Sequence, residues 1–244
     1  MSRLLGFDVK NVYGTNISIN ENHWNKLKKL LNKDIGLKEI KFDFTKNLGT
    51  RAFTAPIKSI RKSPELAEFI GIMLGDGNIY RNQINISFDK RHINYINYVD
   101  NLCNDLFGVK FKGKSMKDTN SSYLYFYNKL LVSKLLELGL KRGNKIENQL
   151  GIPSWIRDNK NFSKRCIRGL IDTDGCIYVC KREKQRYVKF TNHNKKLMGD
   201  FREVTTNLGY PFAKANKTNT CLYRKVEVVR FIKDIKPLKS IIKM

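Results

Sequence analysis

Two segments of this 244-residue chain resemble each other closely enough to constrain its fold. The first runs Glu68-Phe-Ile-Gly-Ile-Met-Leu-Gly-Asp-Gly-Asn-Ile-Tyr80, and the second runs Cys166-Ile-Arg-Gly-Leu-Ile-Asp-Thr-Asp-Gly-Cys-Ile-Tyr178. Similar patterns of apolar and polar residues follow both segments. The distance between them is long enough for each to head a small unit of its own, so the sequence predicts a tandem duplication rather than a repeated short motif.

Each repeat is predicted to begin with an apolar helix. In the first repeat, Ser63 suits the N-cap and Pro64 the first helical position, and apolar residues then recur with helical spacing as far as Leu74. Gly77 is expected to close this helix in a left-handed conformation. The rest of the repeat is predicted as strands at 78–82 and 84–89, a helix over 91–107, strands at 109–114 and 122–127, and a helix over 129–138.

The second repeat has the same predicted order of elements. They are a helix over 163–173, strands at 176–182 and 186–192, a helix over 194–207, strands at 211–217 and 219–225, and a helix over 226–235. The expected fold class is therefore α+β, with two tandem α-β-β-α-β-β-α units related by a pseudo-twofold axis. The predicted division of the chain is an N-terminal extension (1–62), a first domain (63–145), a linker (146–160) and a second domain (161–244).

The charge of the chain indicates the class of its partner. It contains 47 Lys and Arg against 22 Asp and Glu, a net charge of +25. This excess favours a polyanion, first a nucleic acid and second an anionic membrane surface. An aromatic content of 11%, only 5 prolines and the lack of a low-complexity tract argue against a disordered basic tail. The extension 1–62 is expected to add a DNA-binding segment, with a structural strap over the first repeat as the alternative.

No segment is apolar and long enough to suggest a secretion signal or a membrane span, so we expect an intracellular protein with no membrane partner. The protein would work in the cytoplasm, the nucleoid or an organelle matrix. The five cysteines, an odd number, fit a reducing compartment better than a disulfide framework. Cys176, Cys180 and His193 match no common zinc module, so the cysteines are interpreted as small apolar residues in strands.

The end of each first helix suggests metal chemistry. Asp76 and Asp174 follow the apolar helices directly, where unsatisfied carbonyls already carry partial negative charge. A carboxylate is unfavourable for stability there, but it suits a divalent cation with oxygen ligands. Small residues one turn apart allow the two helices to pack closely: Gly71 and Gly75, and Gly169 and Thr173. Such packing would bring the two carboxylates together to hold metal ions against a phosphodiester.

At these residues the chain resembles the LAGLIDADG homing endonucleases, with the motif at Phe69–Gly77 and Ile167–Gly175. The resemblance extends from about residue 63 to residue 236. It implies a monomer that acts as a pseudo-dimer, with the two motif helices at the domain interface and a saddle of antiparallel strands on double-stranded DNA. It also implies site-specific, Mg²⁺-dependent cleavage of both strands of a long site, with Mn²⁺ or Ca²⁺ as substitutes for binding.

The resemblance also assigns roles to single residues. Asp76 and Asp174 would be the catalytic metal ligands, and the backbone carbonyls of Gly75 and Thr173 auxiliary ligands. Asp172 matches an acidic position of the motif but is interpreted as structural, because the first copy has Leu74 there.

The family also places a polar and then a basic residue at the end of the second strand of each domain. These are Asp89 and Lys90 in the first domain and Asn192 and His193 in the second. Lys90 would polarise water or offset charge in the transition state. His193 departs from the expected lysine, and a polar residue at a helix N-terminus is the alternative interpretation.

Strand alternation predicts the side chains that face DNA, with Arg and Asn reading base edges and most lysines contacting phosphate. From the first domain these are Asn78, Tyr80, Arg81, Asn85, Ser87, Lys110, Lys112 and Lys114. From the second they are Tyr178, Lys181, Arg182, Arg186, Lys189, Thr191, Lys214, Asn216 and Arg224. Tyr123, Tyr125 and Tyr127 could equally be strand packing.

Two alternatives to an endonuclease use the same scaffold. One is a maturase that binds intron RNA and assists splicing, and the sequence discriminates poorly against it because a maturase can retain both aspartates. The other is a DNA-binding regulator without nuclease activity. Retention of both aspartates and of the glycines after them, Gly77 and Gly175, argues against the regulator.

Overall fold

The computed structural model describes residues 57–117, 119–180, 183–238 and 242–243, all within one compact unit that spans residues 54–244. The predictions for residues 1–56 and for Lys181 and Arg182 lie outside the described residues. In the part of the chain that is described, no helix is both long and apolar enough to cross a membrane.

The first repeat folds in the predicted order. Its elements are α3 (Pro64–Gly75), β1 (Gly77–Tyr80), β2 (Gln83–Asp89), α4 (Ile93–Phe107), β3 (Lys112–Ser115), β4 (Ser121–Tyr127) and α5 (Lys129–Glu137). The four strands form one antiparallel sheet in the order β1-β2-β4-β3. Ile84, Ile86 and Phe88 of β2 are buried, so one face of this sheet belongs to the hydrophobic core.

The second repeat follows a short helix, α6 (Ser154–Arg157), which lies in the predicted linker. Its elements are α7 (Lys160–Asp174), β5 (Gly175–Cys180), β6 (Gln185–Thr191), α8 (Lys195–Asn207), β7 (Ala213–Lys214), β8 (Asn219–Leu222), α9 (Lys225–Ile235) and β9 (Ile242–Lys243). The sheet order is β7-β8-β6-β5-β9, in which β9 is parallel to β5 and was not predicted. Apart from β9, the second sheet has the topology of the first, and the predicted α+β duplication is confirmed.

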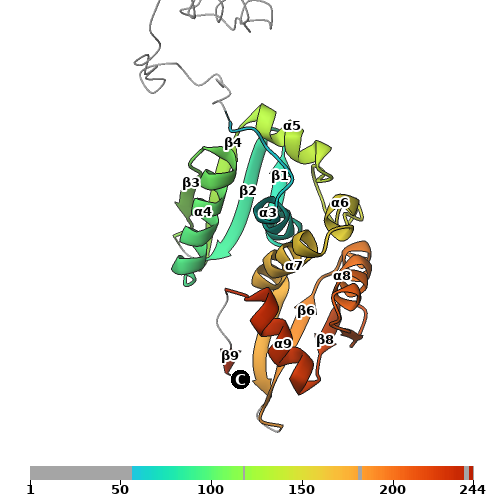
Figure 1. Cartoon of the computed structure of the whole chain (residues 1–244). Coiled ribbons are helices and arrows are strands. Elements are labelled where there is room, and N and C mark those ends of the chain that lie inside the picture. Colours follow the sequence, from blue (N-terminus) through green and yellow to red (C-terminus); the bar gives the residue numbers. More distant parts are fainter. Residues whose placement is uncertain (1–56, 118, 181–182, 239–241, 244) are drawn as a thin grey trace, which may run out of the picture. The chain divides into compact units, whose positions relative to one another are not determined.

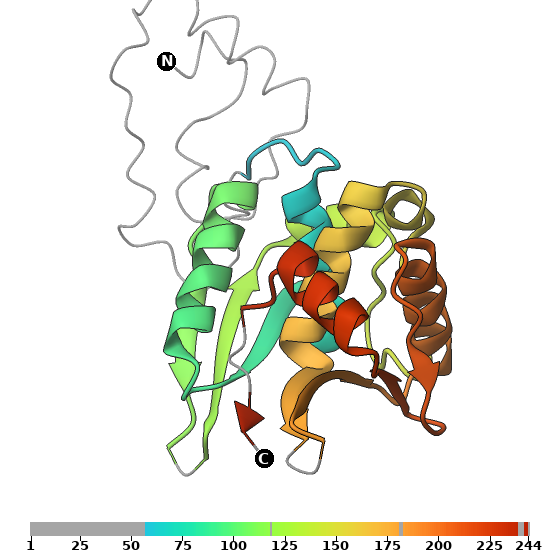
Figure 2. The same ribbon diagram turned by 60° about the horizontal axis from the view of Figure 1, so that its bottom comes forward.

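The two sheets present their hairpins in a similar way. In Figure 2 the β3–β4 and β5–β6 hairpins both extend toward the lower edge of the molecule, one from each repeat. Since each sheet buries one face in the core, the opposite face of each remains available for a partner.

The start of α3 is as predicted, but its end differs. The Ser63 hydroxyl accepts a hydrogen bond from the backbone N–H of Leu66 at 3.1 Å, and Pro64 occupies the first turn. Asp76 ends the helix with right-handed backbone angles, and Gly77 does not adopt the predicted left-handed conformation. Gly77 is instead the first residue of β1, where a β-carbon would collide with the backbone of Met73. The glycine is required by a close approach, not by its φ angle.

The helices α3 and α7 lie side by side between the two sheets (Figure 1). Glycines bring their backbones together: a β-carbon at Gly71 would collide with the carbonyl of Cys166, and one at Gly169 with the carbonyl of Glu68. At the ends of the helices, a β-carbon at Gly75 would collide with the side chain of Thr173. The small residues therefore allow the close packing that the sequence predicts.

A buried ionic network crosses this helix interface. Glu68 of α3 is fully buried, and its carboxylate lies 2.9 Å from Nη2 of Arg165 and 3.6 Å from Nε of Arg168, both on α7. The hydroxyl of Tyr98 on α4 donates a hydrogen bond to the same carboxylate at 2.7 Å. Burial raises the pKa of Glu68, opposed by Arg168, Tyr98 and Arg165, and Glu65 adds to the rise.

This raised pKa makes a prediction about stability. Because the folded protein holds the Glu68 proton more tightly than the unfolded chain does, the stabilising contribution of Glu68 is complete below a pH of about 4.5 and is lost as the pH rises through the folded pKa. Urea unfolding should therefore show that the free energy of unfolding of the wild type falls relative to that of Glu68→Gln as the pH rises. A difference that stays constant, or moves the other way, would contradict the raised pKa.

Candidate active site

The two predicted aspartates end the paired helices. The backbone N–H of Asp76 donates to the carbonyl of Ile72 at 3.0 Å, and its carbonyl accepts from the N–H of Ser87 at 3.1 Å, which fixes the aspartate between α3 and β2. Asp174 is the last residue of α7, and its Oδ2 accepts a hydrogen bond from Nδ2 of Asn192 at 2.6 Å. Both aspartates are half-buried.

Lys145 lies at the C-terminal end of α3, and it lines a pocket together with Asp174, although the sequence analysis did not identify it. Its ammonium group donates to the backbone carbonyl of Gly75 and lies 3.4 Å from that of Met73. Burial lowers the pKa of Lys145, and the charges of Asp174 and Asp76 oppose this shift. The amine is thus held at the C-terminal end of α3.

The position of Lys145 depends on a buried amide in the second repeat. Asn194, with 2% of its surface exposed, donates from Nδ2 to the carbonyls of Lys145 at 3.0 Å and of Leu150 at 2.7 Å. Its Oδ1 accepts from the N–H of Leu197 at 3.2 Å and so caps α8. On the other side, the N–H of Gly143 donates to the carbonyl of Ile79 in β1 at 3.1 Å. The segment around Lys145 is therefore tied to both repeats.

A pocket of about 200 Å³ opens beside Asp174. Residues of both repeats and of the segment between them line it: Leu74, Gly75, Lys145, Ile146, Asp174, Thr191, Asn192, His193 and Asn194. The pocket thus contains His193, which is exposed, and Asn192, as the sequence analysis expected of the site. Lys90 is exposed and does not line this pocket; its backbone N–H donates to the carbonyl of Asn120 at 2.7 Å.

The two polar residues predicted beside the metal ligands differ in their contacts. Asn192 binds Asp174 directly, whereas the carboxylate of Asp89 pairs with Arg91, with Nη2 to Oδ2 at 2.5 Å and Nε to Oδ1 at 3.0 Å. Hydrogen bonds from Arg91 hold the pKa of Asp89 well below its usual range. The two halves of the site are therefore chemically unequal.

The donor set fits a hard divalent cation. Asp76, Asp174 and the carbonyl of Gly75 supply oxygen atoms, which Mg²⁺ and Ca²⁺ prefer. Among the described residues, no three or more His, Cys, Asp and Glu side chains gather into a metal cluster. Two carboxylates and backbone carbonyls would thus need water and a substrate phosphate to complete the coordination.

The two residues that precede Asp174 make contacts that stabilise the fold. The Thr173 hydroxyl donates to the carbonyls of Gly169 at 2.9 Å and Leu170 at 3.0 Å, within its own helix. Asp172 is buried, and its Oδ1 accepts from the backbone N–H of Leu238 at 2.7 Å, which ties the segment after α9 to α7. This contact agrees with the structural interpretation of Asp172.

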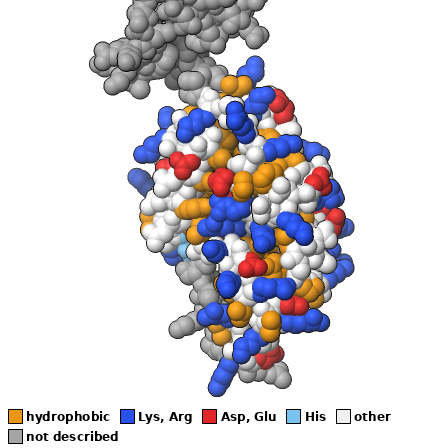
Figure 3. Space-filling view, in the orientation of Figure 1, with side chains coloured by type: hydrophobic (Ala, Val, Ile, Leu, Met, Phe, Trp, Pro, Cys, Tyr) orange, Lys and Arg blue, Asp and Glu red, His pale blue; other side chains and the backbone are white. Residues whose placement is uncertain are grey.

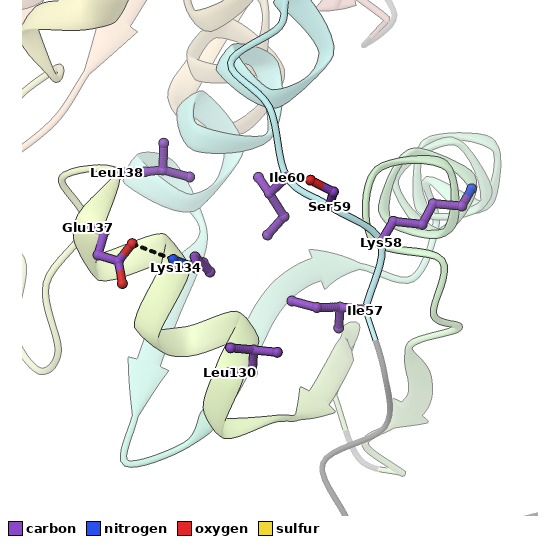
Figure 4. A pocket seen from close by; sticks show the side chains of 8 residues that line it. All are labelled: Ile57, Lys58, Ser59, Ile60, Leu130, Lys134, Glu137 and Leu138. Carbon is purple, nitrogen blue, oxygen red and sulfur yellow. Dashed lines mark hydrogen bonds and ion pairs between the residues drawn. The ribbon is translucent and has the colours of Figure 1, made fainter. Parts of the chain in front are cut away.

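A larger pocket, of about 500 Å³, lies away from the aspartates (Figure 4). It lies between the chain that enters α3 and the helix α5, and is lined by Ile57, Lys58, Ser59, Ile60, Leu130, Lys134, Glu137 and Leu138. Its one carboxylate, Glu137, is paired with Lys134 at 2.8 Å. This pocket therefore offers no second metal-binding group.

The strand register places most of the predicted DNA-facing side chains of the first sheet on its open face. Asn78 pairs with Asn85 and Tyr80 with Gln83, opposite to the buried isoleucines. The remaining predicted positions of this face are Ser87 on β2 and Lys112 and Lys114 on β3. Tyr123 of β4 pairs with both Ser87 and Lys114, and Tyr125 of β4 pairs with Lys112. Tyr123, Tyr125 and Tyr127 thus also lie on the open face. Arg81 and Lys110 are exposed outside the strands.

In the second sheet the register corrects two positions. Tyr178, Lys189 and Thr191 lie on the open face, but Arg186 shares the face of the buried Val188 and Phe190, because alternate residues of β6 point to opposite sides. Lys214 pairs with the buried Thr220 and likewise lies on the core side. Both remain exposed at the ends or edge of the sheet.

Two further predicted contacts are exposed residues outside the strands. Asn216 accepts hydrogen bonds in the β7–β8 turn, and Arg224 pairs with Glu227 at 3.2 Å. On the face seen in Figure 3, Lys and Arg side chains lie over both repeats and outnumber the acidic ones.

Residues 161–233 match the family model of a LAGLIDADG-like domain. Among curated proteins, the replication factor C small subunit of Methanocaldococcus jannaschii is 26% identical over 204 residues. That match covers 66% of this chain and 11% of the relative, so the chain spans about a tenth of the length of the curated protein it matches.

Similar solved structures include mesophilic variants of the homing endonuclease I-DmoI, with 18% identity, a TM-score of 0.47, and coverage of 70% of this chain and 94% of that one. The N-terminal LAGLIDADG domain of DUF199/WhiA has 12% identity, a TM-score of 0.49, and coverage of 73% and 86%. I-DmoI in complex with DNA and Mn has 20% identity, a TM-score of 0.46, and coverage of 73% and 98%.

Proposed function

Residues 161–233 match the model of a LAGLIDADG-like domain, and from this match we propose that the chain is a divalent-metal-dependent, site-specific DNA endonuclease that cuts both strands. One observation carries the proposal: Asp76 and Asp174 end two helices that are packed through glycines, and the amine of Lys145 donates to the carbonyl of Gly75 at the same end of α3. Paired carboxylates of this kind suit phosphodiester hydrolysis. The protein would act as a monomer, since its two repeats supply both halves of the site.

In this proposal Asp76 and Asp174 hold the metal, with the carbonyls of Gly75 and Thr173 as further oxygen ligands. Bound Mg²⁺ would supply an activated water and stabilise charge on the phosphate, and Mn²⁺ or Ca²⁺ would substitute for binding. Asn192 orients Asp174 through its hydrogen bond of 2.6 Å.

Three basic side chains would act beside the metal ligands. Lys145 and His193 lie at the pocket, where a positive charge offsets charge that develops on the phosphate. Lys90, at the end of β2, would approach the phosphate in the first half-site. Asp89 would fix the end of the same strand through Arg91.

The open faces of the two sheets would contact the major groove, with lysines on phosphate and amides on base edges. Because each neutralised phosphate releases counterions, binding should weaken steeply with salt. The basic N-terminal extension, residues 1–62, is proposed to add phosphate contacts to this interface.

The test is cleavage of a DNA library that includes the insertion site of the encoding element, with and without Mg²⁺. We expect a discrete double-strand cut that requires the metal. Tight binding to DNA without a cut under any divalent metal would instead support a regulator, and preferential binding to intron RNA would support a maturase.

Lys145→Met provides a further prediction. Removing a cation that faces developing charge in a partly buried site should lower the cleavage rate by roughly a hundredfold, while DNA affinity changes little. The matched control is Lys141→Met in the same segment, because the exposed Lys141 amine donates to the carbonyl of Asn148 and does not line the pocket beside Asp174. Single-turnover cleavage on a saturating target checks both variants. Equal loss in the two variants would contradict a specific role for Lys145.

A further inference from the structure

The turn of chain that leads into α8 contacts both Asp174 and the segment that carries Lys145. From this arrangement we propose that Asn194, the N-cap of α8, is a positioning residue of the active site, whose side chain holds Lys145 in the pocket beside Asp174. This inference rests on the proposed endonuclease function and adds to it a residue that acts through another residue.

The orientation of the Asn194 amide is determined by the helix that it caps. Its Oδ1 accepts from the backbone N–H of Lys196 at 3.0 Å and of Leu197 at 3.2 Å, as is usual for an asparagine N-cap. The amide oxygen therefore faces α8, and Nδ2 donates to the carbonyls of Lys145 at 3.0 Å and of Leu150 at 2.7 Å. Because only 2% of Asn194 is exposed, water cannot readily replace these partners.

The same turn also supports Asp174, but by a different part of Asn194. The backbone N–H of Asn194 donates to Oδ1 of Asn192 at 2.8 Å. The amide of Asn192 therefore presents Nδ2 to the carboxylate of Asp174, at 2.6 Å. A change of the Asn194 side chain can thus release Lys145 while the backbone contact that supports Asp174 remains.

The first repeat shows that the fold does not require a capping side chain at this place. The counterpart of α8 is α4, whose N-cap is His92, and His92 makes no side-chain hydrogen bond to the helix. The His92 side chain is exposed. Since α4 forms without such a cap, capping alone does not account for a buried amide at Asn194. What its side chain adds is the contact with the segment that carries Lys145.

Two variants remove the donated bonds and keep the cap. Asn194→Asp has the same shape but only acceptor oxygens, and Asn194→Ser is uncharged and shorter, so it cannot reach the two carbonyls. The fold should persist, because the backbone N–H of Ile152 still donates to Oδ2 of Asp200 in α8 at 2.9 Å. The matched control is Asn159→Asp at the exposed N-cap of α7. Thermal unfolding shows whether each variant remains folded.

The first measurement does not depend on cleavage. Hydrogen exchange is followed by mass spectrometry in the peptide that contains residues 143–150, where the N–H of Leu150 donates to the carbonyl of Lys145 at 3.1 Å. Exchange there should be about tenfold faster in both Asn194 variants, because two hydrogen bonds that hold the segment are lost. It should be unchanged in Asn159→Asp, and α3 and α8 should exchange as in the wild type.

The second measurement is single-turnover cleavage of a saturating target, with Kd measured separately in Ca²⁺. Each Asn194 variant should cut roughly tenfold to a hundredfold more slowly with little change in Kd, because misplacing a catalytic group by about 1 Å can cost a hundredfold. In a Lys145→Met background, Asn194→Ser should cause no further loss of rate, whereas in a Lys141→Met background it should cause the full loss. A residue that only stabilises the fold would lower the rate equally in both backgrounds.

Three results would overturn the inference and leave the endonuclease intact. They are unchanged exchange of residues 143–150 in both Asn194 variants, normal cleavage by these variants when folded, and a full further loss of rate in the Lys145→Met background. A wild-type protein that cuts no DNA under any divalent metal would overturn the proposed function, and the inference with it, whatever the exchange rates.

Discussion

Asp174→Asn and Asp76→Asn are each expected to lower the rate of double-strand cleavage by about a thousandfold. Each substitution removes a negative oxygen ligand where two helices meet, and a bound metal ion contributes several kcal/mol to stabilising the transition state. At 1.36 kcal/mol for each factor of ten, this corresponds to a loss of about three orders of magnitude.

The measurement is single-turnover cleavage of the target in Mg²⁺, with binding followed separately in Ca²⁺. Binding should remain measurable, because the sheet faces are unchanged. The matched control is Asp158→Asn, an exposed aspartate that ends the short helix α6 and should cut at the wild-type rate. Normal cutting by either site variant would refute the assignment of these carboxylates.

Gly71→Ala and Gly169→Ala are each expected to destabilise the fold strongly. Both glycines lie at the interface between α3 and α7, which positions the two aspartates. In each variant the new β-carbon meets a backbone carbonyl, of Cys166 or of Glu68, which cannot rotate away as a side chain can. Overpacking of this kind costs about 3 kcal/mol or more. For a protein of this size the Tm should fall by roughly 6–12 °C.

Gly199→Ala supplies the control for this series. Gly199 lies inside α8, and among the described residues nothing beyond the adjacent turns of its own helix would lie within 4 Å of an added β-carbon. Alanine there should raise stability by about 0.5–1 kcal/mol, because it restricts the unfolded chain and favours the helix. Circular dichroism during heating compares the three variants. If Gly71→Ala and Gly169→Ala melt with the wild type, α3 and α7 cannot pack as closely as described.

Much of the fold was predictable because the signals are local. The hydroxyl of Ser63 caps α3 by accepting a hydrogen bond from the N–H of Leu66, three residues later. Gly108 ends α4 with a positive φ, and the alternation of apolar residues in β2 determines which face of that strand is buried. Some boundaries moved because of a cap that was overlooked: Asn159 accepts hydrogen bonds from Asn161 and Phe162, so α7 begins at Lys160 rather than at residue 163.

The site was only partly predictable. Asp76, Asp174, Asn192 and His193 follow from the motif and from the strand that comes after it, since each lies at a definite distance from a helix end. Lys145 had no such signal, because its amine reaches the carbonyl of a residue 70 positions earlier in the chain.

The sequence by itself determined the duplication, the order of the elements and the two carboxylates at the helix ends, because periodicity and capping depend on neighbours within a few residues. Only the tertiary structure decided that Lys145 lies at the end of α3 in the pocket beside Asp174, and that Asn192 donates a hydrogen bond to Asp174. The physical reason is that these contacts join residues far apart in the chain: the buried amide of Asn194 holds Lys145 across 49 residues. Contacts over such separations leave no periodic trace in the sequence.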